Sequence, residues 1–259
     1  MLHRAGLFAP WEAGFDPTPP PPAAGEATGP PDFVGVGVQK AGTSWWNELV
    51  CAHPAVTARP DIHKERHYFA RYAVEAFGAD DVARYHGWFP RRPGTLAGEW
   101  TPDYLMFPWV PPLLARAAPE ARVLVLLRDP VERFRSGLSF RLAQGAHDAE
   151  AVRADAVRHG WYGRHLRELA AHVDPARILV LLYERCATDP AGELARTYAF
   201  LGLDPFVPDD VRREVNTSGV KVTLHEDARR RLAELYAPDV ALLADDHPEL
   251  DLGLWPNFR

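Results

Sequence analysis

Cysteine and long apolar runs are scarce in this chain, and each shortage excludes a class of protein. Among its 259 residues, Cys51 and Cys186 are the two cysteines, too far apart to suggest a disulfide framework or a CxxC zinc site. No run of about 18 apolar residues occurs, which argues against a membrane span. Residues 1–11 lack the apolar core of a secretory signal, so we expect a cytoplasmic protein.

Lysine is also rare. Of 29 basic residues, only Lys40, Lys64 and Lys221 are lysines, and a GC-rich genome accounts for most of this bias. Because an ammonium and a planar guanidinium are not interchangeable, the three lysines also mark candidate positions for a compact charge. The net charge of −6 argues against a general nucleic-acid binder.

Histidine is more plentiful, but its spacing does not favour a metal site. Of eleven histidines, only His63 and His67 have the spacing to chelate from one helix face. Lys64 stands where a zinc protease needs a glutamate, and no third ligand is evident. We therefore expect no metal.

The chain divides into an arm, residues 1–32, and one domain, residues 33–259. Residues 12–32 are rich in proline, glycine and alanine, which excludes a helix or a central strand there. We expect partial order in the arm, because Leu7, Phe8 and Trp11 can pack on the domain. The oligomeric state is left open.

Apolar segments alternate with helical ones in the domain. Strands are expected at 33–38, 97–99, 122–127 and 177–182, and helices at 43–51, 131–143, 191–201 and 227–243, the last broken at Pro238. This order predicts an α/β fold with a central parallel β-sheet flanked by helices. Ligands of such sheets bind beyond the carboxyl ends of the strands, where the polar turns of this sequence fall.

The turn GVQKAGTS, residues 37–44, has the properties of a phosphate-binding loop. Its glycines let backbone amides approach an anion, and the helix that follows adds partial positive charge. A nucleotide-triphosphate P-loop has lysine directly after the second glycine, whereas here Thr43 follows Gly42 and Lys40 precedes it. The loop is P-loop-like, although an ordinary glycine-rich turn is an alternative.

A second candidate anion site follows the strand at 122–127. Arg128 stands at the end of that strand, and Ser136 follows two helical turns later. Two anion sites at neighbouring strand ends imply a ligand with two separated phosphates. The alternative is a surface ion pair between Arg128 and Asp129 or Glu132.

Two of these segments together resemble the nucleotide-binding signatures of sulfotransferases: QKAGTSW, residues 39–45, and LRDPVERFRS, residues 127–136. Three more matches follow in the family's order: KERHYF at 64–69, GEWTPDY at 98–104 and LYE at 182–184. The resemblance runs from Phe33 to the Trp255 region and is closer to bacterial and heparan-sulfate-type members than to cytosolic ones. It implies a single P-loop-like domain that uses 3′-phosphoadenosine 5′-phosphosulfate (PAPS) as sulfuryl donor, without a metal.

The resemblance also implies where the 5′-phosphate of PAPS binds. Lys40 would contact the 5′-phosphate and the bridging oxygen, and so stabilise the leaving group. The backbone amides of Ala41, Gly42, Thr43 and Ser44, with the two hydroxyls, would hold the 5′-phosphate.

Other residues would bind the remainder of the donor. Trp45 either stacks on the adenine or is a core aromatic. Arg128 and Ser136 would hold the 3′-phosphate, and Tyr183 would lie near the adenine base. Lys221 either closes over the 3′-phosphate or is a solvated lysine.

Glu65 is the general-base candidate, because it occupies the position of the heparan-type base in KERHYF. The alternatives are a salt bridge of Glu65 with Lys64 or Arg66, and His67 as the base. Trp100 replaces a lysine of the heparan-type pattern, and Lys64 is the candidate to supply that missing cation. Trp100 also suggests an apolar wall at the acceptor site, together with further aromatic residues nearby in sequence: Trp88, Phe89, Tyr104 and Trp109.

We therefore expect a bacterial sulfotransferase of secondary metabolism, with a hydroxyl, less readily an amine, of a small metabolite or carbohydrate as acceptor. The alternatives are a P-loop-type kinase and a non-catalytic nucleotide-binding module. Two features count against a kinase: Lys40 precedes Gly42 instead of following it, and Arg128 and Ser136 form a second candidate anion site.

Overall fold

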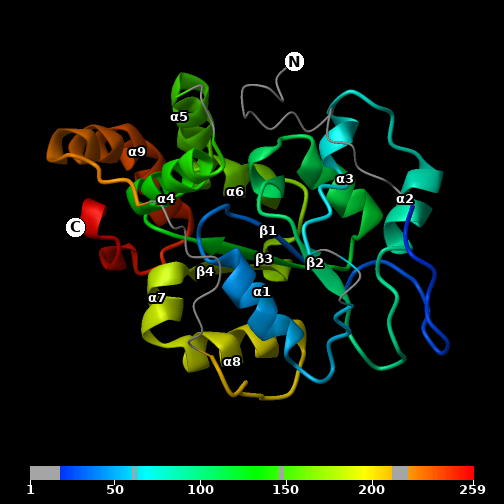
Figure 1. The fold of residues 1–259 in the computed structure, drawn as a ribbon. Coiled ribbons are helices and arrows are strands. Elements are labelled where there is room, and N and C mark those ends of the chain that lie inside the picture. The colour runs from blue at the N-terminus through cyan, green and yellow to red at the C-terminus, as the bar shows by residue number, and fades with distance from the viewer. Residues whose placement is uncertain (1–17, 60–61, 63, 146–148, 212–220) are drawn as a thin grey trace.

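The computed structural model of the chain describes residues 18–59, 62, 64–145, 149–211 and 221–259. Four parallel strands form its sheet in the order β2-β1-β3-β4 (Figure 1). They are β1 (Phe33–Gly37), β2 (Gly98–Trp100), β3 (Arg122–Leu127) and β4 (Ile178–Leu182). The expected α/β fold with a central parallel sheet and a P-loop-like turn is therefore confirmed, and each expected strand lies within one or two residues of its observed bounds.

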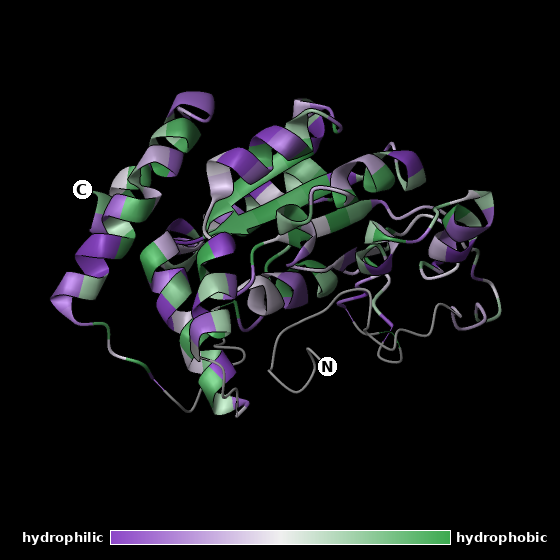
Figure 2. Ribbon diagram, turned by 90° about the horizontal axis from the view of Figure 1, so that it is seen from above, coloured by the Kyte–Doolittle hydropathy of each residue, from purple (hydrophilic) through white to green (hydrophobic). Residues whose placement is uncertain are grey.

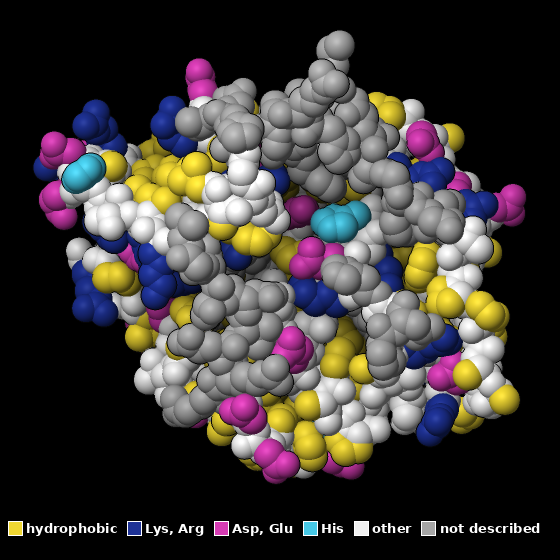
Figure 3. Space-filling view, in the orientation of Figure 1, with side chains coloured by type: hydrophobic (Ala, Val, Ile, Leu, Met, Phe, Trp, Pro, Cys, Tyr) yellow, Lys and Arg dark blue, Asp and Glu magenta, His cyan; other side chains and the backbone are white. Residues whose placement is uncertain are grey.

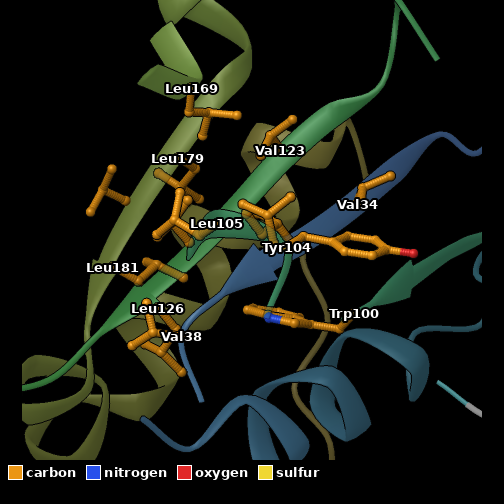
Figure 4. Packing of buried hydrophobic residues seen from close by; sticks show 14 of the residues in the cluster. Val34, Val38, Trp100, Tyr104, Leu105, Val123, Leu126, Leu169, Leu179 and Leu181 are labelled. Carbon is orange, nitrogen blue, oxygen red and sulfur yellow. The ribbon is translucent and has the colours of Figure 1, made fainter. Parts of the chain in front are cut away.

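The strands are mostly apolar because both faces of the sheet are covered. Residues 123–127 of β3 are buried, and β3 pairs in register with β1 at Val34↔Val123 and with β4 at Val125↔Val180. Figure 2 shows the strands as a hydrophobic layer between helices of mixed hydropathy. Figure 4 shows Leu179 near Val123 and Leu181 near Leu126, so that side chains of the neighbouring strands β4 and β3 pack together.

Helices surround this layer. The indole Nε1 of Trp46 on α1 donates to Thr197 on α8 at 3.1 Å, which fixes these two helices to each other on one face. Helices α3 and α6 lie on the other side of the sheet (Figure 1). The helices are α1 (Thr43–Cys51), α2 (Ala79–His86), α3 (Val110–Ala117), α4 (Pro130–Ala143), α5 (Ala149–Arg158), α6 (Tyr162–Ala170), α7 (Tyr183–Thr188), α8 (Pro190–Leu201) and α9 (Glu226–Asp246).

Helix α9 corrects one expectation, because it continues through Pro238 instead of breaking there. The proline ring lies on the exposed side of the helix, where water can satisfy the carbonyl that loses its partner. At the next residue, which is buried, the carboxylate of Asp239 accepts hydrogen bonds from the backbone amides of Gly163 and Arg164 at 2.8 and 3.1 Å. This buried contact caps the first turn of α6 and fixes α9 to it one residue after the proline.

The described part of the arm, residues 18–32, packs against the domain. Ala27 pairs with Arg91 in an antiparallel bridge, and Glu26 forms an ion pair with Arg59 at 3.4 Å. The arm is therefore attached to two loops of the domain. Leu7, Phe8 and Trp11 lie outside the described residues, and the domain boundary at 32 and 33 stays a prediction.

The carboxyl ends of the strands bring three polar turns and the start of α7 to one edge of the sheet. These turns follow β1 at 38–42, β2 at 101–103 and β3 at 128–129, while α7 begins directly after β4. Every functional residue that the sequence suggests at a strand end therefore lies along this edge. Among the helices of the described residues, none combines the length and apolar character needed to cross a membrane.

Candidate functional site

The loop between β1 and α1 is shaped to bind an anion. Gly42 adopts a φ of 90° at the N-terminus of α1, and a Cβ there would lie 2.9 Å from the ring of Tyr183. Glycine therefore permits both the turn and the close approach. The first helical hydrogen bond joins the Trp46 amide to the Gly42 carbonyl, so the amides of residues 43–45 precede the helical hydrogen-bond ladder. These amides and the helix dipole suit a phosphate.

Lys40 and Arg128 meet beside this loop. Nη1 of Arg128 donates to the Lys40 carbonyl at 3.4 Å, and its guanidinium carbon lies 4.5 Å from the centroid of the Tyr183 ring. Burial and the charge of Arg128 lower the pKa of Lys40, and the charge of Glu65 opposes that change. The structure therefore places two mutually repelling cations beside a helix N-terminus, which is an arrangement that an anion would stabilise.

The aromatic and hydroxyl candidates lie around these cations. Trp45 is half-buried and meets Tyr183 edge to face at 6.3 Å, while its Nε1 donates to the Val211 carbonyl at 3.0 Å. Ser136 is half-buried on α4, one turn before Ser139. The two alternatives for Trp45, adenine stacking and core packing, both stay open.

Lys221 is exposed at the end of the segment 212–220, which lies outside the described residues. The amide of the next residue, Val222, donates to Oγ of Ser139 at 3.0 Å. Lys221 is thus held beside the helix that carries Ser136, and its role at the 3′-phosphate stays a prediction.

Glu65 lies between the side chains of Lys64 and His67. Its Oε1 is 2.6 Å from Nζ of Lys64, and its Oε2 is 3.6 Å from Nε2 of His67. Burial favours a higher pKa for Glu65, but the hydrogen bonds and charges of His67 and Lys64 outweigh it and hold the pKa at about 2. Glu65 is therefore an ionised carboxylate, and the salt bridge to Lys64 that the sequence suggested as an alternative does form.

A buried carboxylate organises the backbone of this segment. Glu99 is 1% exposed and accepts the hydroxyl of Thr101 at 2.7 Å. Oγ1 of Thr101 in turn accepts the backbone amides of Arg66 and His67 at 2.9 and 3.3 Å. The turn after β2 therefore fixes the segment that carries Glu65.

Backbone strain is concentrated in the two segments that carry Lys40 and Glu65. Among the described residues, Lys40 and His67 are the two non-glycine residues with positive φ, at 67° and 48°. Such conformations persist where the surroundings impose them, and they cluster at functional sites. On the face drawn in Figure 3, a histidine near the centre has acidic and basic side chains beside it, so a charged cluster is accessible there.

Asp103 extends the cluster into the interior and was missed by sequence reasoning. Its Oδ2 lies 3.9 Å from Nδ1 of His67, and its Oδ1 lies 4.0 Å from Nε2 of His159. Burial raises the pKa of Asp103 to about 6, against the opposing charge of His67. The available signal was a carboxylate within the GEWTPDY segment, four residues after Glu99.

Arg133 was also missed. This side chain is fully buried on α4, and a Cβ placed on Gly137 would lie 3.5 Å from its Nη1 and 3.9 Å from Cγ of Lys40. It therefore adds a third cation near the loop after β1. The signal was its place in LRDPVERFRS, one turn before Ser136.

Trp100 does not line an acceptor site, which corrects the expectation of an apolar wall. Its indole is fully buried and covers Gly35 of β1, and its Nε1 donates to the Gly37 carbonyl at 3.1 Å. Figure 4 shows the indole packed in the interior beside β1. The side chain at this position therefore belongs to the core, and Lys64 serves as the ion-pair partner of Glu65.

Among the described residues, no three His, Cys, Asp or Glu side chains are arranged to hold a metal ion. His63, one member of the pair with chelating spacing, lies outside the described residues. His67 faces two carboxylates within ion-pair distance.

Comparison with known proteins identifies the family. Residues 66–209 match the sulfotransferase family. The chain belongs to this family. Heparan sulfate glucosamine 3-O-sulfotransferase 6 of Mus musculus is 33% identical over 193 residues, which are 69% of this chain and 54% of that protein. The 3B1 enzyme of the same species is 29% identical over 194 residues, 69% of this chain and 48% of that protein. The chain thus spans about half the length of the curated relatives it matches.

Solved structures agree with this assignment. A sulfotransferase from Alicyclobacillus acidocaldarius has a TM-score of 0.71 and 25% identity, covering 87% of this chain and 98% of that one. The sulfotransferase domain of the curacin biosynthetic pathway has a TM-score of 0.53 at 14% identity, covering 70% and 77%, and supports the fold alone. The predicted family and the predicted enzyme class, a sulfotransferase, are therefore confirmed.

Proposed function

We propose that this sulfotransferase moves a sulfuryl group from PAPS to a hydroxyl, less readily to an amine, of a small metabolite or a carbohydrate. The observation that carries the proposal is the position of Lys40, which interacts with the charges of both Arg128 and Glu65 at the N-terminus of α1. The matched heparan sulfate 3-O-sulfotransferases support a carbohydrate acceptor. A cytoplasmic location and a role in bacterial secondary metabolism stay predictions.

The residues present fit the charge distribution of PAPS. Bound PAPS would supply the sulfuryl group on a phosphate leaving group, together with a 3′-phosphate. The amides of residues 43–45 and the Lys40 ammonium suit the 5′ side of such a donor. Arg128, on the neighbouring strand end, and Ser136 suit the second phosphate.

Lys40 is placed to stabilise the charge of a leaving oxygen. Its Nζ lies 4.0 Å from the centroid of the Phe140 ring, so the ammonium is held in a partly buried position. In such surroundings a fixed cation stabilises developing negative charge more than it would in water.

Glu65 is placed to take the proton from the acceptor. A carboxylate with a pKa of about 2 is a weak base, because His67 and Lys64 stabilise its charge. Negative charge arriving at Lys40 and Lys64 would offset these cations and raise the pKa of Glu65. Glu65 would then be a better proton acceptor only when both substrates are bound.

Nucleotide binding tests the proposal. Calorimetry should show that the desulfated product, 3′-phosphoadenosine 5′-phosphate (PAP), binds at least about tenfold more tightly than ATP, because Arg128 provides a second phosphate contact. Equal or tighter binding of ATP would contradict the proposal and favour the kinase alternative.

Turnover tests the base. Glu65→Gln should lower kcat at least about a hundredfold, while PAP affinity stays within about threefold of wild type. Glu75→Gln is the matched control, since Glu75 is exposed and paired with Arg71 away from the site. Wild-type turnover in Glu65→Gln would exclude Glu65 as the base.

A further inference from the structure

A cavity of about 310 Å³ is lined in part by Lys64, which precedes the proposed base in the sequence. It lies between the C-terminal half of α1 and residues 57–59, 62, 64 and 66, and Trp88 and Phe89 form another wall. Such a volume is at the lower end of small-molecule sites, which span about 300–1,000 Å³. It therefore has room for a compact molecule or one end of a larger one.

Lys64 connects the cavity to the candidate active site. Its side chain lines the cavity, and its Nζ is 2.6 Å from Oε1 of Glu65. A molecule whose body occupies the cavity can thus extend one end past Lys64 toward Glu65. This is the geometry needed by an acceptor that holds its hydroxyl at the base and its remainder in the cavity.

The cavity has an apolar lining. Phe33 and Phe89, which form part of it, are each only 1% exposed, and Trp88 presents a half-buried indole. Further apolar lining comes from Cys51, Ala52, Ile62, Pro90 and Ala97. Such walls favour an apolar or aromatic ring, because ring burial removes apolar surface from water.

The charged residues of the cavity already have partners of their own. Arg59 pairs with Glu26 at 3.4 Å, and Lys64 pairs with Glu65. The guanidinium of Arg66 lies 5.1 Å from the centroid of the Trp88 ring. Glu48 adds an exposed carboxylate to the lining. A polyanionic chain would have to compete with these carboxylates, so the cavity favours an uncharged group.

We propose that this cavity binds the non-reacting part of the sulfate acceptor, and that this part is a compact, uncharged apolar or aromatic ring. The proposal rests on the proposed function, because it takes Glu65 as the group that meets the acceptor hydroxyl. It narrows the acceptor from any metabolite or carbohydrate to a small phenol-like or cyclic alcohol.

The arm contributes to the same cavity. Glu26 of the arm forms an ion pair with Arg59, and Nη1 of Arg59 also donates to the Pro21 carbonyl at 3.2 Å. These two contacts fix a cavity-lining side chain from outside the domain. The arm is therefore part of the acceptor site through Arg59.

Calorimetry with 2-naphthol on protein saturated with PAP tests the cavity. Ala52 and Ala58 are exposed residues of the lining, so Ala52→Phe and Ala58→Phe would fill the cavity without altering the core. Each should weaken 2-naphthol binding at least about tenfold. Ala241→Phe, on the exposed side of α9, is the matched control and should bind as wild type does.

The outcomes separate the two proposals. If PAP binds but 2-naphthol does not, or binds equally well to both filled variants, the cavity assignment is overturned and the proposed function stands. Tighter binding of an N-sulfated glucosamine tetrasaccharide than of 2-naphthol, lost in Ala58→Phe, would overturn the uncharged-ring assignment. Failure of wild type to bind PAP would instead count against the proposed function, whereas normal PAP affinity shows that each variant is folded.

Discussion

The Oδ2 atom of Asp103 lies 3.9 Å from Nδ1 of His67, while Oε2 of Glu65 lies 3.6 Å from Nε2 of the same ring. Two carboxylates from different segments thus flank one imidazole. Burial alone would lower the pKa of His67, but Glu65 and Asp103 outweigh it and raise the pKa. A raised pKa favours the protonated form of His67, which cannot accept a proton. This arrangement therefore favours Glu65 as the base and His67 as the group that orients it.

Asp103→Asn should change the pH dependence of turnover. Without the Asp103 charge, the pKa of His67 falls, and His67 loses its proton at lower pH. Turnover should then begin to decline at lower pH on the alkaline side than in wild type. The pH profile of kcat checks this, and superimposable profiles would show that Asp103 has only a structural role.

Asp103→Asn should also change how the free energy of unfolding depends on pH. The pKa of Asp103 is raised from 3.8 to about 6 in the fold, so folding favours the protonated form. Its contribution to the free energy of unfolding is therefore most favourable below pH 4 and is lost as the pH rises through 6. Thermal unfolding between pH 4 and 7 should show a decline in wild type that is smaller in Asp103→Asn. If the melting temperature of the variant declines as much as that of wild type, groups other than Asp103 cause the loss of stability.

Lys40→Arg should be nearly inactive although it keeps the charge. The Lys40 chain passes Gly137, and its Nζ lies over the Phe140 ring, which leaves a position suited to a compact ammonium. We expect kcat to fall at least about a hundredfold and PAP affinity less than about tenfold. Arg230→Lys, an exchange of the same two side chains at an exposed position on α9, is the control. A fully active Lys40→Arg enzyme would remove the leaving-group role.

Arg128→Ala should weaken binding selectively through the 3′-phosphate. PAP affinity should fall at least about tenfold, whereas adenosine 5′-phosphosulfate, which lacks that phosphate, should bind within about twofold of wild type. Calorimetry with both nucleotides measures the difference. Because Arg128 also contacts the Lys40 carbonyl and the Tyr183 ring, parallel losses for both ligands would mean that it acts by holding the loop.

The sheet and the loop between β1 and α1 were predictable because the sequence patterns that indicate them are local. The RVLVLL run and the helix after Gly42 each reflect a few neighbouring residues whose preferences agree with the final fold. The pairing of Lys64 with Glu65 was also predictable, since the two residues are adjacent.

The remainder depends on contacts between distant segments. Asp103 meets His67 only because the turn after β2 lies beside residues 64–67. The cavity exists only when α1, residues 57–59 and Trp88 come together. The orientation of Trp100 depends likewise on the register of β2 with β1. A single sequence contains the residues that form these contacts but does not show which of them meet. Asp103 and His67, for example, are 36 positions apart.

Trp100→Lys should unfold the domain rather than restore a catalytic cation. The family resemblance alone would suggest that lysine at this position aids catalysis. The structure predicts the opposite, because Trp100 is fully buried and its Nε1 donates to the Gly37 carbonyl at 3.1 Å. Loss of a buried indole, with an ammonium left in the core, should lower the free energy of unfolding by about 3–5 kcal/mol. Denaturant unfolding measures this, and a stable variant with raised activity would contradict the burial of Trp100.

A double-mutant cycle with Gly35 separates packing from charge. A Cβ on Gly35 would lie 2.1 Å from Cδ2 of Trp100, so Gly35→Ala should be strongly destabilising in wild type. In a Trp100→Ala background the same methyl group finds space, and its cost should be smaller by at least about 1 kcal/mol. Additive losses would show that the two residues do not pack together. A coupled result would establish that Trp100 is held by β1, and that glycine at position 35 is required by the indole that covers it.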